Sequence, residues 1–175
     1  TGPDTPAYGT RNFQIFTESS IIGTPLGTNK ATGNDDFLAT WMGIGSQLDG
    51  LGHLGIDYTY YNGHKESEFL RPHGLLLLST DKVPPIVTRG VLLDFVALQG
   101  GNLAPGKAIN RTEIEAAVAK QGTPIRKGDV VLLHTGWLAS MAAKDKKAFL
   151  EKEPGLGKGG AEYLASLGVV AVGSD

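Results

Sequence analysis

Three polar residues lie close together in a glycine-rich stretch of the sequence, between Gly43 and Gly55. They are Gln47, Asp49 and His53. If this stretch is extended, the three side chains fall on one face, because strand side chains alternate. Carboxylate and imidazole groups are common carriers of protons in sites, so the spacing predicts a small polar site. The alternative is a polar turn in which Asp49 bonds backbone amides.

The other histidines give weaker signals. His64 and His73 have a spacing that suits no common metal-binding pair, and we interpret both as exposed or loosely bonded. His134 closes an apolar run that starts at Val130. The end of a strand is a frequent location for sites in α/β folds. A hydrogen-bonded histidine at the edge of the core explains His134 equally well.

The elements that must position these residues follow from the hydrophobic pattern. Glycines at alternate positions near Asp49 allow a ligand or another segment of the chain to approach closely. Thr112, as N-cap, and Gly122 delimit one predicted helix. Helices and strands alternate only in the second half, which predicts an α/β fold with a mixed sheet. The predicted strands are 13–16, 37–41, 91–96, 130–134 and the run from 169, and further helices are predicted over 142–150 and 160–167.

Composition limits the classes of function. The chain has 175 residues, of which 41% are hydrophobic and 19% charged, so it can bury a core. The net charge of −2 gives no reason to expect nucleic acid or an anionic membrane as partner. No cysteine is present, which excludes disulfides and thiolate metal sites. The apolar runs are too short to span a bilayer.

An ordered set of motifs resembles a known family. The set comprises Gly43 to His53, Tyr61-Asn-Gly63, Arg89 to Asp94, Gly128 to Trp137, Pro154 to Gly157 and Val169 to Asp175. It is similar to the cyclase family of metal-dependent hydrolases, which includes bacterial kynurenine formamidase and isatin hydrolase. The family fingerprint, His-x-Gly-Thr-His-x-Asp-x-Pro-x-His, falls on positions 43 to 53.

The resemblance implies roles for some residues and removes others. Asp49 matches a metal ligand of the family, and His53 matches the residue that accepts and donates protons. The two metal-binding histidines of the fingerprint are replaced by Gly43 and Gln47, so Gln47 is expected to be a substitute ligand. Family chains continue past the Gly-Ser-Asp element, at Asp175 here, to a further histidine and glutamate. We therefore expect the metal site of this chain to be incomplete.

The resemblance also implies a fold and an activity. The expected fold is the swivelling β/β/α domain over residues 13–175, incomplete at its C-terminus, after an arm or linker at 1–12. The expected activity is metal-dependent hydrolysis of an amide, formamide or lactam-like C–N bond in a small cyclic or acylated substrate. Trp137 and His134 are expected to contact that substrate. The alternative is a non-catalytic, small-molecule-binding member of the fold that has lost its metal.

The implied cofactor is a divalent ion, manganese or zinc. Because carboxylate and amide oxygens suit harder ions, the loss of two imidazoles favours manganese. We further expect a cytoplasmic protein that forms homo-oligomers, by analogy with family enzymes.

Overall fold

The computed structural model describes residues 11–19, 25–141 and 146–175. The chain divides into two compact units, Thr1–Ile86 and Val87–Asp175. The expected arm at 1–12 lies outside the described residues except for its last two positions, and its boundary stays a prediction.

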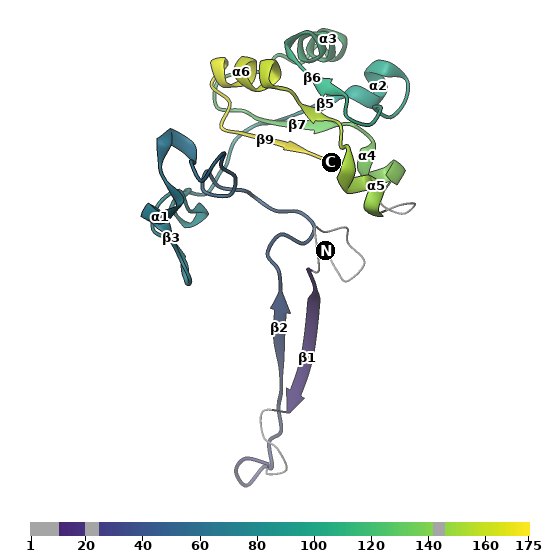
Figure 1. Ribbon diagram of the computed structural model, residues 1–175. Coiled ribbons are helices and arrows are strands. Elements are labelled where there is room, and N and C mark those ends of the chain that lie inside the picture. The colour runs from purple at the N-terminus through teal and green to yellow at the C-terminus, as the bar shows by residue number, and fades with distance from the viewer. Residues whose placement is uncertain (1–10, 20–24, 142–145) are drawn as a thin grey trace. The chain divides into compact units, whose positions relative to one another are not determined.

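A hairpin forms the first part of the N-terminal unit. Strands β1 (Phe13–Ser19) and β2 (Asn34–Thr40) pair antiparallel, with Phe16 opposite Phe37 (Figure 1). The two rings lie 6.2 Å apart, which adds a favourable cross-strand contact. Both predicted strands are confirmed, each with a longer span than the apolar run alone indicated.

After the hairpin, the described part of the N-terminal unit contains several short elements. These are η1 (Tyr61–Gly63), α1 (Glu66–Phe69), β3 (Leu70–Arg71), β4 (Gly74–Leu75) and η2 (Thr80–Lys82). Phe69 is buried and meets the edge of the Tyr60 ring at 5.1 Å. The Tyr60 hydroxyl donates to Glu66, and this bond raises the pKa of the tyrosine.

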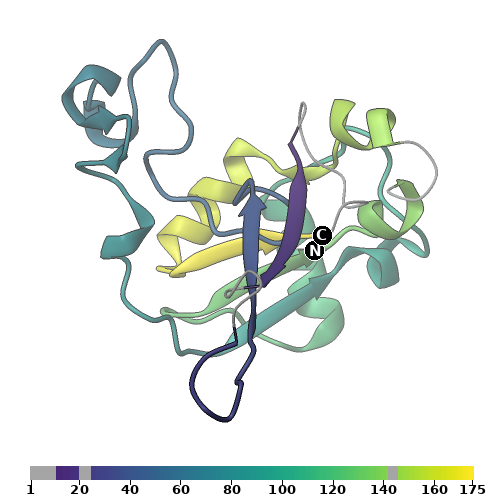
Figure 2. The same cartoon turned by 90° about the horizontal axis from the view of Figure 1, so that it is seen from below.

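The C-terminal unit is an α/β layer built on a parallel sheet. Strands β5 (Gly90–Asp94), β7 (Val130–His134) and β9 (Ala171–Ser174) lie side by side in that order, as Figure 2 shows. A second parallel pair joins β6 (Ala108–Ile109) to β8 (Gly155–Leu156). The α/β class is confirmed, and among the described residues the parallel and antiparallel pairings lie in different sheets and not in one mixed sheet.

Helices cover one face of the parallel sheet. The helices α3 (Arg111–Gln121) and α6 (Lys158–Ser166) lie on the same side of the strands (Figure 1). The described part of this unit also contains three shorter helices: α2 (Phe95–Gln99), α4 (Trp137–Met141) and α5 (Lys146–Glu151). Strand side chains alternate accordingly, since Val131 is buried and Leu132 is 43% exposed. The buried cluster is Val91, Leu93, Phe95, Leu103, Ile109, Ile114, Ala117, Val131, Leu133 and Leu164.

Some predicted boundaries are corrected by the structure. Asn110, not Thr112, is the N-cap of α3, and Glu113 accepts a hydrogen bond from the Asn110 backbone N–H at 2.9 Å. Both residues have a glutamate three positions later, so the capping-box spacing does not distinguish them, and asparagine is the better N-cap of the two. Gly122 ends the helix in the left-handed conformation, as predicted. The helix predicted over 142–150 is observed from Lys146, and 142–145 lie outside the described residues.

Among the described residues, no helix combines the length and the apolar character needed to cross a membrane.

Candidate functional site

The stretch around Asp49 is irregular backbone and not the strand that the alternation of residues suggested. A tight turn reverses the chain at Gly50 to His53, where the His53 N–H donates to the Gly50 carbonyl at 3.0 Å. The strand interpretation is therefore wrong for this stretch. Asp49 and His53 meet across the turn and not along a pleated face.

The glycines of this turn admit a neighbouring segment of the chain. The Gly52 N–H donates to the Leu78 carbonyl at 3.1 Å. A Cβ at Gly52 would lie 2.8 Å from Leu75 Cδ1, and one at Gly50 would lie 3.0 Å from the Leu78 carbonyl oxygen. Both distances are shorter than an ordinary contact, so the packing requires residues without a side chain. Close approach by another segment, one of the two uses expected for these glycines, is confirmed.

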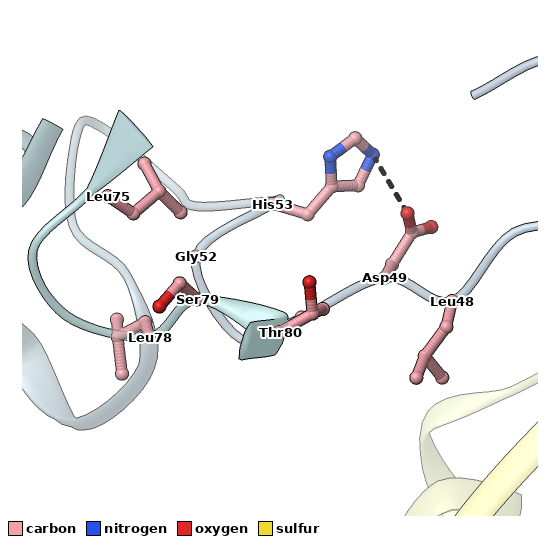
Figure 3. A pocket seen from close by; sticks show the side chains of 9 residues that line it. Leu48, Asp49, Gly52, His53, Leu75, Leu78, Ser79 and Thr80 are labelled. Carbon is pink, nitrogen blue, oxygen red and sulfur yellow. Dashed lines mark ion pairs between the residues drawn. The ribbon is translucent and has the colours of Figure 1, made fainter. Parts of the chain in front are cut away.

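The turn and the packed segment enclose a pocket of about 390 Å³ (Figure 3). In it, His53 Nε2 faces Asp49 Oδ1 at 3.9 Å, and the two side chains point toward each other. Gln47 lies beside them and donates from its amide nitrogen to Asp49 Oδ2 at 3.2 Å. The structure therefore brings together the three predicted residues, and Ser79 and Thr80 line the same pocket.

The Asp49–His53 contact lies near the surface, and it is an ion pair only when the imidazole is protonated. The side chains are 48% and 45% exposed, so water screens their attraction, and such pairs contribute about 1 kcal/mol or less to stability. The contact orients the two side chains. One oxygen of the Asp49 carboxylate faces the His53 imidazole, while the Gln47 amide binds the other oxygen. Because both side chains are half exposed, a ligand can reach the carboxylate and the imidazole.

The expected metal ion finds a poor donor set here. Gly43 has no donor, and the Gln47 amide presents its nitrogen to Asp49. One carboxylate and one imidazole fall short of the four ligands that zinc requires. No group of three or more potential metal-binding side chains occurs in the part of the chain that the structure describes. These residues do not fit the ion, and manganese or zinc stays a prediction.

In the C-terminal unit, His134 pairs with a carboxylate at the end of the parallel sheet. Its Nδ1 lies 3.0 Å from Asp94 Oδ1, across neighbouring strands β5 and β7. Asp94 also accepts from the Ala97 N–H, and these two hydrogen bonds, the backbone one first, lower the pKa of its carboxyl. The ring borders an apolar pocket of about 440 Å³ with Leu92 and Leu132. The hydrogen-bonded alternative for His134 is therefore observed, while its contact with substrate stays a prediction.

Trp137 lies in the interior of its unit. The residue is 5% exposed, its indole N–H donates to the Phe149 carbonyl at 2.9 Å, and its ring stacks on that of Phe149. A structural role is therefore observed, and its contact with substrate stays a prediction. Of the two remaining histidines, His64 lies 3.2 Å from Glu68 and His73 is exposed in the turn between β3 and β4.

Sequence reasoning missed several residues near these sites. Arg11 donates to the Gly43 carbonyl at 3.0 Å from 32 positions away, and no local spacing indicates this contact. Ser79 and Thr80 follow an apolar run and carried no motif. Asp94 belongs to the predicted strand 91–96, but its pairing with His134 on the neighbouring strand is seen only in the structure.

Comparison with known proteins shows what the chain resembles. A family model described as "Putative cyclase" matches residues 2–175. A solved structure described as a novel cyclase has a TM-score of 0.83 at 25% identity and covers 98% of this chain. An isatin hydrolase bound to the product analogue thioisatinate has a TM-score of 0.63 at 21% identity and covers 99%. This chain spans 61% and 63% of those two proteins. No curated protein matches.

Proposed function

Since the chain belongs to the cyclase family, we propose that it provides the proton-transferring pair of a hydrolase that cleaves an amide or lactam-like C–N bond in a small cyclic or acylated substrate. The observation that carries this proposal is the pairing of His53 with Asp49 in a pocket that solvent can enter. The fold shared with an isatin hydrolase supports the scaffold, although that likeness concerns the fold alone.

The chemistry assigned to this chain is acid–base catalysis. The His53 imidazole takes a proton from a water molecule while the water oxygen adds to the carbonyl carbon. It then returns the proton to the nitrogen as the C–N bond breaks. Asp49 stabilises the imidazolium between these steps, and Gln47 keeps the carboxylate turned toward the ring. The hydroxyls of Ser79 and Thr80 line the pocket where a polar substrate atom would bind.

The second candidate is a non-catalytic protein that binds a small molecule in the same pocket. The observation that favours it is the set of possible metal ligands. Three positions match metal ligands of the family, namely Gly43, Gln47 and Asp49, and only Asp49 carries a charge. Homo-oligomer formation is part of both proposals, by analogy with family enzymes.

The test compares two histidine variants of the purified protein. Hydrolysis of an N-formyl anilide and of an aryl-fused lactam is followed by absorbance for the wild type, His53→Ala and His73→Ala. We expect His53→Ala to lower the rate by roughly 10²–10⁴, the usual contribution of a positioned acid–base group. His73 is the matched control because it is an exposed histidine of the same unit. Equal rates for both variants would overturn the hydrolase and favour the binding protein.

A further inference from the structure

Two side chains fill the space beside Gly43. The Arg11 guanidinium donates from Nη1 to the Gly43 carbonyl. A Cβ placed on Gly43 would lie 2.6 Å from Arg11 Nη1 and 2.7 Å from Gln47 Oε1. Real Cβ atoms do not approach other atoms so closely, so position 43 has no room for a side chain in this arrangement. Arg11 and Gln47 therefore occupy the space that a side-chain metal ligand at position 43 would need.

The Arg11 guanidinium places a positive charge beside Gly43. An arginine guanidinium stays protonated at all working pH values. Among the described residues, Arg11 forms no ion pair that would neutralise it. A divalent ion bound next to it would meet electrostatic repulsion, and its attraction to the single carboxylate of Asp49 would be offset. The Gln47 amide oxygen is on the side of Gly43 and Arg11, while its nitrogen is committed to Asp49.

We propose that Arg11 excludes a divalent cation from the site beside Gly43 and Gln47, and that the Asp49–His53 pair works without a metal ion. Arg11 is then a positioning residue: it holds the backbone at Gly43, from which Gln47 reaches Asp49. The inference concerns the site of the proposed function, but its test measures metal binding, so the two can fail separately.

Substitutions can free the space at position 43 that Arg11 and Gln47 occupy. The atoms that crowd position 43 are the ends of two flexible side chains and not backbone, so they can move. Gly43 also lacks the left-handed backbone conformation that would strain another residue. Replacing Arg11 by alanine, with Gly43→His and Gln47→His, therefore places two imidazoles beside Asp49 and removes the competing charge.

The experiment is calorimetric titration of untagged protein with manganese chloride and with zinc chloride. We expect no saturable binding to the wild type. We expect the triple variant Arg11→Ala, Gly43→His, Gln47→His to bind one equivalent at least 100-fold more tightly, and to lose it when Asp49→Asn is added. The matched control keeps both histidine substitutions but replaces Arg126, an exposed arginine of the other unit, in place of Arg11. This control should bind manganese and zinc clearly more weakly than the triple variant does.

Two results would overturn the inference. One is stoichiometric, micromolar binding of either ion to the wild type that disappears in Asp49→Asn. The other is a folded triple variant, by circular dichroism, that binds no better than the Arg126 control. If the triple variant does not fold, the single variant Arg11→Ala is titrated instead, and binding no tighter than that of the wild type overturns the inference.

Discussion

Asp175 and Thr135 are joined by two hydrogen bonds that connect motifs 40 residues apart. One oxygen of the Asp175 carboxylate accepts from the Thr135 backbone N–H at 2.8 Å and from its hydroxyl at 2.6 Å. The other oxygen accepts from the Gly136 N–H at 2.8 Å. Thr135 is buried, so the carboxylate satisfies polar groups that would otherwise be costly. The Thr-Gly-Trp and Gly-Ser-Asp motifs therefore lie together for a structural reason.

The first prediction concerns this carboxylate. Asp175→Ala removes the acceptor for three donors, and hydrogen bonds to a charged group contribute about 1.5–3 kcal/mol. We expect the melting temperature to fall by roughly 4–10 °C, measured by circular dichroism. Ser174→Ala is the control, because among the described residues that hydroxyl makes one long bond of 3.4 Å, to the Leu133 carbonyl. Equal melting temperatures for the two variants would contradict the assignment.

A second prediction concerns Asp49. In the proposed mechanism its charge stabilises the imidazolium of His53, so Asp49→Asn should lower kcat by roughly 10–100-fold while KM changes little. A carboxylate that mainly binds substrate would instead raise KM. Steady-state kinetics on the N-formyl anilide distinguish the two. Asp57→Asn serves as the control, since Asp57 is an exposed aspartate of the same unit.

The third prediction is loss of stability in acid. Arg89 forms two contacts with Asp129, at 2.9 and 2.5 Å, and the arginine holds the pKa of that carboxyl below its ordinary value of 3.8. A lowered pKa in the folded state means that this stabilisation is complete above pH 3.8 and is lost as the pH falls below it. The lowered pKa of Asp94 acts in the same direction.

The measurement is the melting temperature between pH 6 and the acid limit. Asp129→Asn should melt lower than the wild type at pH 6, and the difference should shrink as the pH falls below 3.8. A difference that stays constant across this range would show that the charge of Asp129 does not stabilise the fold.

The fourth prediction concerns two adjacent glycines at the start of α6. A Cβ at Gly160 would lie 2.4 Å from the Ile109 carbonyl oxygen, which is backbone and cannot move aside cheaply. A Cβ at Gly159 would lie 3.2 Å from the Asn110 side-chain oxygen, which can shift slightly. Gly160→Ala should therefore cost about 1–3 kcal/mol of unfolding free energy, while Gly159→Ala should change it by less than about 1 kcal/mol. Urea denaturation of both variants checks the contrast.

The sequence by itself determined the local elements and the candidate residues. The alternation of apolar residues at Phe13 and Phe37 and the apolar runs at Val91 and Val130 are all strands in the structure. The position of Gly122 marks the end of α3. These features depend on side chains a few residues apart, and such short-range patterns can be read from the chain alone. The same applies to the choice of Gln47, Asp49 and His53 as one group.

Only the tertiary structure decided how that group is assembled. His53 meets Asp49 across a turn, because the glycines of the turn let the segment from Leu75 to Thr80 pack against it. Arg11 reaches Gly43 from 32 residues away, and Asp175 reaches Thr135 from 40. Such contacts depend on which segments of the folded chain lie side by side. The spacing of residues along the sequence carries no information about that, so the chemical character of the site was decided by the fold.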